Sequence, residues 1–416
     1  MAKPHVADHA PVSQGQRVSA LSPAPVPTRT GGGARRIRLL FDNRLPPGAA
    51  SALALFAAIR MAGIVAIAVA NHLAGHPMLK GLAHSWDSRW YLHIAQHGYG
   101  TYVHVLHNGA VQRDWAFFPL YPGLIRAVHT VLPITPGAAA LLVAWSAAGV
   151  AAYGIYVIGH RLYGRAVATV LVGVWAAMPH SVVLDLAYTE SLMTALAVWA
   201  LYAVLTGRWL WAGVLAALAG LSRPTGFSVA AAVVFVALHE IVRRRGRVPL
   251  ALWFGAAIAP LGWVSFVLWV GAHMGDLFGG YFTVQRAWDS RFDFGAGSLH
   301  FLKGLLVHGG RVVYPLALVI VAAAILLFCL LCVDRAPLAL IVYAGILLLI
   351  TVGGSGPYAS KPRFLLPAFP LLIPLARGLV RTWRVRPKQA CLLGIALTLL
   401  SVTYGTYLMT TSRTPL

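Results

Sequence analysis

One carboxylate set among aromatic residues is the first candidate for chemistry in this sequence. Asp87 follows the first long apolar run and is flanked by Trp86, Trp90 and Tyr91. Tryptophan and tyrosine favour the boundary between lipid and water. We therefore expect Asp87 at the level of the lipid headgroups, where a lipid-borne reactive group would also lie. An interfacial aromatic belt with an incidental acid is the simpler alternative, and the rest of the chain must decide between them.

Two further acids lie beside a long apolar segment. Asp185 and Glu190 enclose Tyr188, at the start of a run that is long enough to enter a membrane. Acids inside or beside such a run are expensive in lipid, so by default they are functional or paired. A helix end that faces water is the structural alternative for this pair.

Three cations follow later in the chain, each close to a predicted helix end. Arg223 stands in the segment 222–226, whose proline and glycine break the helices on either side. Lys361 and Arg363 precede another apolar run, on the side of the membrane where basic residues are usually scarce. These three residues are candidates for anion binding, and anchoring to lipid headgroups is the alternative.

Together these residues match the needs of transfer from a lipid-linked phosphosugar. A carboxylate can take the proton from an acceptor hydroxyl, and cations can stabilise the departing phosphate as its charge develops. We predict Asp87 as the base, with Glu190 as its rival, and Arg223, Lys361 and Arg363 as donor-phosphate ligands. The side chains that we expect to contact substrate are Trp86, Arg89, Trp90, Tyr91, Asp114, Phe118, Tyr121, Asp185, Tyr188 and Glu190.

The composition indicates what must position these side chains. Of the 416 residues 59% are hydrophobic and only 11% are charged, with a mean hydropathy of +0.73. Soluble domains carry roughly 25% charged residues. Repeated apolar runs of about twenty residues predict an all-α polytopic membrane protein, because a helix satisfies its own backbone in lipid. The net charge of +22 is then explained by the topology of the chain and by contact with anionic lipid headgroups, and not by binding to nucleic acid.

The apolar runs predict about eleven transmembrane helices. A Pro-, Ala-, Ser- and Gly-rich segment, residues 1–45, forms a predicted disordered basic tail, and residues 46–416 form the membrane domain. We expect a first extracytoplasmic loop at 75–136 and a second at 273–310. The predicted spans are 50–74, 137–159, 165–183, 189–206, 209–222, 226–242, 249–272, 311–333, 337–353, 363–380 and 389–410.

The distribution of charge predicts the orientation. With the tail in the cytoplasm, the cytoplasmic segments hold 20 of the 33 Lys and Arg residues, as the positive-inside rule requires. Seven of the eleven acids then fall outside or at the outer ends of spans. For Asp276, Asp289 and Asp293, solvated loop acids are the favoured interpretation.

The first loop has a pattern of its own. Residues 90–98 predict a short interfacial helix that ends at Gly98. After the turn that ends at Pro122, the segment to about residue 131 predicts a second surface helix before Pro133, with a membrane span at 117–132 as the alternative. His93 and His97 have the spacing of one helix face and could hold a metal ion, but amphipathic helices often carry histidine. Cys329 and Cys332 form a C-x-x-C inside an apolar run without further ligands. We therefore assign no metal site.

Several short motifs, taken together, resemble the PIG-V family of mannosyltransferases. The resemblance runs from about residue 80 to 370. The matching segments are Trp86-Asp87-x-x-Trp90-Tyr91-x-x-Ile94-Ala95-x-x-Gly98-Tyr99, Phe117-Phe118-Pro119-Leu120-Tyr121-Pro122, Tyr188-x-Glu190-Ser191 and Ser222-Arg223-Pro224-x-Gly226. Each motif alone is weak, whereas their combination is fairly specific.

The resemblance implies a GT-C glycosyltransferase fold and inverting transfer of mannose from polyprenyl-phosphate-mannose on the extracytoplasmic face. It makes the Trp86-Asp87 pair catalytic. The Ala, Gly and Arg content indicates an actinobacterial member in a bacterial plasma membrane, with a lipid-linked glycan, glycolipid or other cell-envelope acceptor. No Asp-x-Asp follows the first span, so no cofactor is firmly implied, although Mg²⁺ or Mn²⁺ is compatible with this chemistry.

Two functions of other classes stay open at this point. A transporter or flippase for polyprenyl-linked lipids or sugars would require repeat symmetry and charges at mid-membrane. Arg60, near the middle of the first span, is the one residue in its favour. A scaffolding subunit would leave the clustered acids unexplained.

Overall fold

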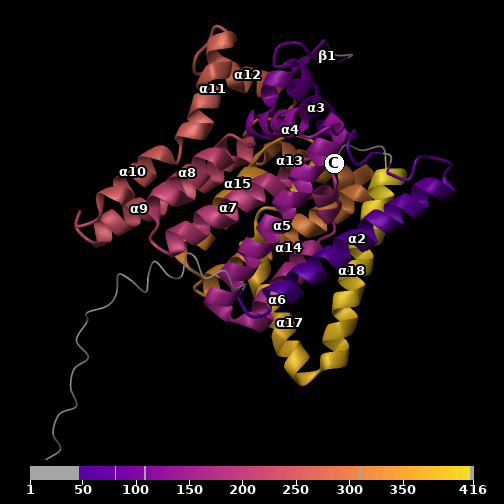
Figure 1. The fold of residues 1–416 in the computed structure, drawn as a ribbon, viewed down its shortest axis with the longest axis vertical. Coiled ribbons are helices and arrows are strands. Elements are labelled where there is room, and N and C mark those ends of the chain that lie inside the picture. Colours follow the sequence, from indigo (N-terminus) through magenta and orange to yellow (C-terminus); the bar gives the residue numbers. More distant parts are fainter. Residues whose placement is uncertain (1–45, 80, 107–108, 309–310, 413–416) are drawn as a thin grey trace, which may run out of the picture. The chain divides into compact units, whose positions relative to one another are not determined.

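The chain is a multi-pass helical membrane protein. The computed structural model describes residues 46–79, 81–106, 109–308 and 311–412, so the predicted tail lies outside the described residues. Six helices in this part are long and apolar enough to cross a membrane, and a bent pair makes a seventh. This architecture confirms the predicted all-α polytopic fold, and Figure 1 shows its elements.

The elements follow one another in a simple order. The first half of the described chain contains α2 (Ala49–Leu73), α3 (Asp87–His97), β1 (Val103–Val105), β2 (Val111–Arg113), η1 (Asp114–Ala116), α4 (Leu120–Val131), α5 (Pro136–Tyr163), α6 (Arg165–Ala176), η2 (Ser181–Asp185), α7 (Glu190–Leu205) and α8 (Trp209–Gly220). The second half contains η3 (Pro224–Gly226), α9 (Phe227–Arg243), α10 (Leu250–Ile258), α11 (Leu261–His273), α12 (Gly280–Ala287), α13 (Ala296–His308), α14 (Val313–Val333), α15 (Leu338–Gly353), η4 (Tyr358–Ser360), α16 (Lys361–Phe364), η5 (Phe369–Leu372), α17 (Ile373–Val385) and α18 (Pro387–Thr410).

Each of the eleven predicted spans coincides with an apolar helical segment. Besides the six long helices and the bent pair, four shorter apolar helices, α6, α7, α8 and α15, occupy the remaining predicted positions. At 12 to 16 residues, these four are shorter than the roughly twenty that an upright span needs. The predicted spans 189–206, 209–222 and 337–353 match three of these helices closely, whereas α6 ends before the predicted 165–183 does, because η2 occupies residues 181–185.

Proline explains where the bent pair breaks. Residues 358–364 and 369–385 meet at 81°, and Pro362, Pro367 and Pro370 fall at or near the bend. Proline lacks a backbone N–H and clashes with the preceding turn, so an α-helix cannot continue through this run. The break leaves α16 as a short helical turn beside α15, and this turn carries two of the predicted cations.

Small residues allow α8 to lie directly against the α10–α11 segment. A Cβ atom on Gly262 would collide with the carbonyl oxygen of Ala217 in α8. Such close backbone approach is typical of helix pairs in membranes, where packing replaces the hydrophobic effect as the driving force. The contact holds the end of α8, and hence Arg223, in a fixed position.

The first loop folds largely as predicted. Its two surface helices are α3 and α4, and a short antiparallel hairpin of β1 and β2 lies between them. Helix α4 has 12 residues, too few to cross a bilayer, and buries Tyr121 and Ile125. The hairpin was not predicted, because its strands have three residues each, too few for an alternating pattern to be recognised.

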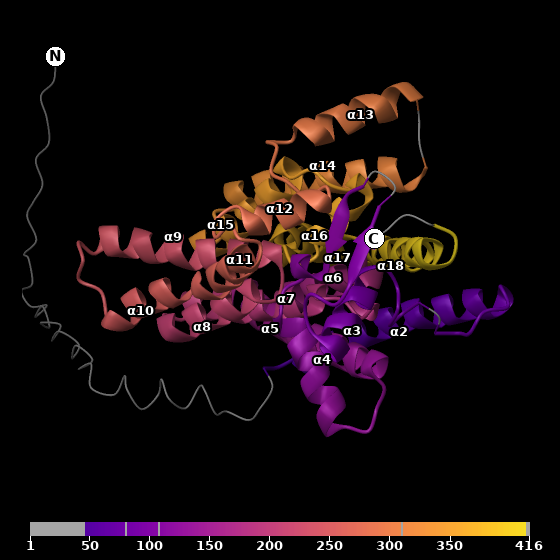
Figure 2. The ribbon, with the colours of Figure 1, turned by 90° about the horizontal axis from the view of Figure 1, so that it is seen from above.

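The second loop is more ordered than predicted, since it contains α12 and α13. Its segment 289–297 is hydrogen-bonded to residues 353–355 after α15: Asp293 donates its backbone N–H to the Gly353 carbonyl, and Ser355 Oγ donates to the Asp289 carbonyl. Figure 2 shows α13 beside α14. This attachment ties the second loop to the segment that leads into α16.

The predicted orientation can be tested by labelling from one side. In a chain whose Cys329, Cys332 and Cys391 are replaced by serine, His104→Cys and Ser290→Cys should react with a membrane-impermeant maleimide in intact cells. Arg247→Cys should react only after the membrane is opened. All three side chains are exposed, so access to the reagent depends on the side of the membrane. Labelling of Arg247→Cys in intact cells would contradict the orientation.

Candidate active site

Four charged side chains from four distant segments meet in one ion-pair chain. Arg223 Nη1 lies 2.5 Å from Glu190 Oε1, and the same oxygen lies 3.5 Å from Arg363 Nε. Arg363 Nη1 in turn lies 2.8 Å from Asp87 Oδ2. Two guanidinium groups and two carboxylates therefore balance formally. We call these four residues the charge cluster.

The members of the charge cluster differ sharply in access to solvent. The side chains of Glu190, Arg223 and Arg363 are 2%, 8% and 9% exposed, whereas that of Asp87 is 26% exposed. Buried charges persist only when they are paired, because leaving water costs several kcal/mol per ion. Glu190 thus holds the two arginines together inside the protein, and Asp87 forms the open end of the cluster.

Several donor atoms of the two arginines face carboxylates in ion pairs without a well-directed hydrogen bond. Among the residues that the structure describes, none accepts a hydrogen bond from Nε or Nη1 of Arg223 or Arg363. The carboxylates approach these atoms closely, but off the directions of the N–H bonds. Guanidinium groups favour bidentate contact with oxyanions such as carboxylate or phosphate. Of the four atoms, only Arg223 Nε has neither a hydrogen bond nor an ion pair among the described residues, so it is the donor left for a further anion.

Aromatic faces fix the direction of both guanidinium groups. The ring of Phe364 lies 5.4 Å from the Arg223 guanidinium carbon and 5.0 Å from that of Arg363. Tyr188 lies 5.3 Å from Arg363 on another side. Cation–π contacts of this kind are attractive, and they become stronger when the pair is shielded from water. Phe364 was not predicted, although its place beside Arg363 in an otherwise polar turn was the available signal.

Local backbone structure brings Asp87 to the cluster. Trp86, the residue before α3, has φ 42° and ψ −112°. A non-glycine residue in such a conformation costs about 1–3 kcal/mol and persists only where surrounding contacts enforce it. The Asp87 backbone N–H donates to the Tyr188 hydroxyl at 3.3 Å, and the partly buried Trp86 ring packs against the apolar cluster formed around α2, η2 and α18. The strained turn thereby presents the carboxylate to Arg363.

Tyr91, one turn into α3, lines the same region. Its hydroxyl lies 3.3 Å from Thr189 Oγ1. Burial raises the pKa of Tyr91 well above its ordinary value, and the negative charge of Asp87 raises it further. The phenol therefore stays protonated and can donate a hydrogen bond near the cluster.

Aromatic packing closes the site on the side of the two loops. Trp90 stacks on Phe117 with ring centroids 5.5 Å apart, and Trp288 from the second loop meets both rings edge-on. Trp288 Nε1 also donates to the Arg113 carbonyl at 3.2 Å. The two loops thus form one shell over α3. Trp288 was not predicted, because nothing in its local sequence links it to a residue two hundred positions earlier.

Several predicted contact residues lie in positions that support the loop. Asp114 is buried and accepts a hydrogen bond from the Gly100 backbone at 2.8 Å, and burial raises the pKa of its carboxyl group. Phe118 and Tyr121 are fully buried, and the Tyr121 hydroxyl donates to the Ala140 carbonyl. Arg89 is exposed and donates to the His84 carbonyl. Contact of these four residues with substrate stays a prediction.

Lys361 lies two residues from Arg363 but has partners of its own. Its ammonium donates to the carbonyl oxygens of Thr351 and Gly354 at 2.7 and 2.6 Å. Cations are favourable at this end of a helix, where carbonyl groups lack intrahelical partners. The structure thus uses Lys361 to attach α16 to the end of α15.

Asp185 is separate from the charge cluster and pairs with Arg60 of α2. The two groups are 3.4 Å apart, and Arg60 also donates to the Ala176 carbonyl and to Ser181 Oγ. A Cβ atom at Gly63 would lie 2.6 Å from Arg60 Nη2, so glycine is needed there for this side chain to reach its partners. Arg60 therefore fixes the irregular segment between α6 and α7, which ends at Glu190.

The described residues contain no group of three or more His, Cys, Asp or Glu side chains that could hold a metal ion. The rings of His93 and His97 stack at 4.5 Å. Burial, followed by the charge of His97, lowers the pKa of His93.

No protein-family model matches the sequence, and no curated protein is significantly similar to it. Solved structures do share its fold. The apo oligosaccharyltransferase of Archaeoglobus fulgidus superposes with a TM-score of 0.54 at 12% identity, over 87% of this chain and 57% of that one. The same enzyme tethered to an acceptor peptide with the NVT sequon gives a TM-score of 0.53 at 12% identity, over 87% and 56%.

A third solved structure is similar to this chain. ArnT from Cupriavidus metallidurans in the apo state gives a TM-score of 0.53 at 14% identity, over 87% of this chain and 65% of that one. The chain therefore spans a little over half to two thirds of the length of these proteins. At such low identity the likeness is one of fold, and it shows that the chain has the GT-C fold of membrane glycosyltransferases.

The Arg60–Asp185 pair predicts a stability effect away from the charge cluster. Arg60→Leu leaves a buried carboxylate without its partner, which typically costs about 3–5 kcal/mol. We expect a clear fall in the thermal unfolding temperature in detergent, partly restored by Asp185→Asn in the same chain. Arg243→Gln, which breaks an exposed pair with Glu240, is the matched control and should change little. Equal effects of Arg60→Leu and Arg243→Gln would refute the assignment.

Proposed function

We propose that this chain is a GT-C mannosyltransferase. In this proposal it transfers mannose from polyprenyl-phosphate-mannose to a lipid-linked or cell-envelope acceptor on the extracytoplasmic face of a bacterial plasma membrane. The observation that carries the proposal is the charge cluster: two buried arginines held by Glu190, beside a carboxylate that solvent can reach. The motif combination that resembles the PIG-V family supports mannose as the sugar.

The proposed reaction is a single displacement with inversion at the anomeric carbon. The acceptor oxygen forms a bond to that carbon while the bond from the carbon to the phosphate oxygen breaks. Asp87 takes the acceptor proton, and polyprenyl phosphate leaves with the bonding electron pair. Arg223 and Arg363 stabilise the charge that develops on the phosphate, an electrostatic contribution that is usually large in enzymes.

Exposure favours Asp87 over Glu190 as the base. A base must lie within hydrogen-bond reach of the proton that it removes. Glu190 is enclosed between Arg223 and Arg363 with a side chain only 2% exposed, so an acceptor hydroxyl would have to displace an arginine to reach it. The Asp87 side chain is 26% exposed, so an acceptor hydroxyl can reach it. We assign Glu190 the role of holding the two arginines at phosphate-binding distance.

The transporter alternative loses its main support. Arg60 was the mid-membrane charge in its favour, and the structure gives this residue partners within the protein. A neighbour that is an oligosaccharyltransferase, solved with an acceptor peptide, also favours transfer over transport for this fold. The acceptor of the present chain is proposed only as a class.

Two substitutions separate the base from its rival. Asp87→Asn keeps the size of the side chain but cannot take a proton, so we expect kcat to fall about 10²–10⁴-fold with donor binding retained. Glu190→Gln should weaken donor binding, because Arg223 and Arg363 lose the charge that holds them together. The measurement is steady-state transfer kinetics together with equilibrium binding of a short-chain polyprenyl phosphate.

The same pair of variants can overturn the assignment. Folded Asp87→Asn protein that keeps more than about a tenth of wild-type turnover would exclude Asp87 as the base. A larger kcat loss in Glu190→Gln, with donor binding unchanged, would make Glu190 the leading candidate.

The cations can be separated in a similar way. Arg223→Lys and Arg363→Lys keep the charge but lose the planar fork, so each should weaken polyprenyl phosphate binding about tenfold. Lys361→Met should lower the thermal unfolding temperature and leave the affinity for polyprenyl phosphate nearly unchanged, because the partners of Lys361 are backbone carbonyls. A Lys361→Met protein of normal stability that no longer binds polyprenyl phosphate would return this residue to the phosphate site.

A further inference from the structure

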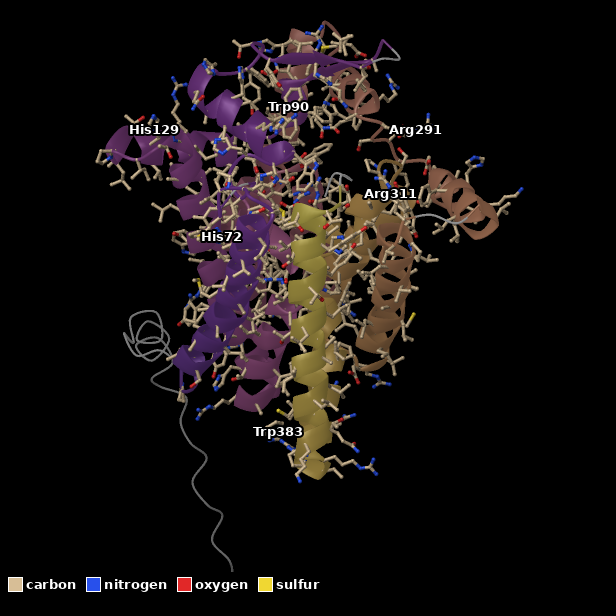
Figure 3. All side chains as sticks on the ribbon, turned by 90° about the vertical axis from the view of Figure 1, so that its right-hand side faces the viewer. His72, Trp90, His129, Arg291, Arg311 and Trp383 are labelled. Carbon is tan, nitrogen blue, oxygen red and sulfur yellow. The ribbon has the colours of Figure 1, made fainter. Side chains whose placement is uncertain are left out.

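The end of the protein far from the charge cluster carries a compact basic surface. Helix α17 ends at Val385 and α18 begins at Pro387, so a single residue joins them. Four exposed cations lie at this turn: Arg381, Arg384, Arg386 and Lys388. We call them the basic turn. Figure 3 shows Trp383 in this turn at the opposite end of the view from Trp90 of the site.

The cations of the basic turn have no anionic partner in the part of the chain that the structure describes. The sequence has no Asp or Glu after Asp334, and Asp334 itself is paired with Arg377 one turn earlier in α17. Among the described residues, no ion pair joins an acid to any of the four. Four like charges held within eight residues repel one another, so an external anion is the favourable partner.

A second basic turn shows that this arrangement is not general. Between α9 and α10, Arg243 and Arg244 both pair with Glu240. Arg243 and Arg244 are exposed, and the carboxylate of Glu240 in the same helix is their partner. Arg245 and Arg247 of that turn have no ion pair among the described residues, so the α17–α18 turn differs in that none of its four cations has one.

The apolar surroundings identify the partner as lipid. Trp383 and Val385 are 56% and 77% exposed between the arginines, and Leu392 and Leu393 are exposed one turn into α18. A tryptophan at the rim of an apolar helix surface marks the boundary between the acyl chains and the headgroups. The basic turn therefore lies at the depth of the phosphate groups of one leaflet.

We propose that the basic turn is a binding surface for anionic phospholipid headgroups. Guanidinium and ammonium groups contact the phosphodiester oxygens, while Trp383 and Val385 enter the adjoining acyl region. Basic residues beside an anionic leaflet are attracted to it until salt screens the interaction. The surface is independent of the proposed reaction, because it lies on other residues and needs no donor.

The test compares lipid retention by full-length protein in detergent micelles that contain equal amounts of phosphatidylglycerol and phosphatidylcholine. Native mass spectrometry would count the lipids bound after dilution. We expect wild-type protein to retain phosphatidylglycerol preferentially, and Arg381→Gln/Arg384→Gln/Arg386→Gln/Lys388→Gln to lose this preference about tenfold. Arg243→Gln/Arg244→Gln, a matched change in the partnered turn, should behave like wild type.

Further arms keep the result interpretable. Should the fourfold variant fail to fold, Arg384→Gln/Lys388→Gln removes two exposed charges and should show an intermediate loss. Millimolar glycerol phosphate should not displace the bound lipid, since it has no acyl chain. Displacement by glycerol phosphate, or an unchanged lipid preference in the folded fourfold or twofold variant, would overturn the proposal.

Discussion

The pairing of buried charge is the constraint on which the rest of this structure depends. Three charged side chains of the cluster, Glu190, Arg223 and Arg363, are almost removed from water. Each would be prohibitively costly alone, and together they persist because every carboxylate has a cation within ion-pair distance. The helix ends, prolines and irregular turns of the site are the means by which four distant segments deliver these groups to one place.

The irregular segments are where the fold departs from a simple bundle. Helix α7 begins a few residues after the 3-10 turn η2, and α16 follows the 3-10 turn η4 and ends where the bent span breaks. Arg60 and Lys361 stabilise these two breaks by contacting backbone carbonyls and, for Arg60, Asp185. The charged residues near the site thus belong to two groups. One group forms the charge cluster, and the other stabilises the backbone segments that position it.

Much of this could be predicted from the sequence, and the limits have physical reasons. Apolar runs predicted the apolar helical segments of the membrane domain, because burial in lipid demands a composition that the loops do not share. The charged residues of the cluster were all named in advance, since an isolated charge beside a span is conspicuous. Their pairing was not predicted, because partners such as Glu190 and Arg363 are brought together only by the packing of α7 against α15 and of α15 against α16. The helices of the second loop were missed, since short segments of mixed polarity carry no periodic signal.

Transfer of label from a defined donor tests the central claim most directly. Purified protein in proteoliposomes would be incubated with polyprenyl-phosphate-mannose labelled in the sugar and with a lipid extract of bacterial membranes. The account predicts that label moves from the carrier lipid to a component of the extract, with inverted anomeric configuration, and that nucleotide-linked mannose does not substitute. Label that stays on the carrier with every extract, while the folded protein is present, would contradict the account.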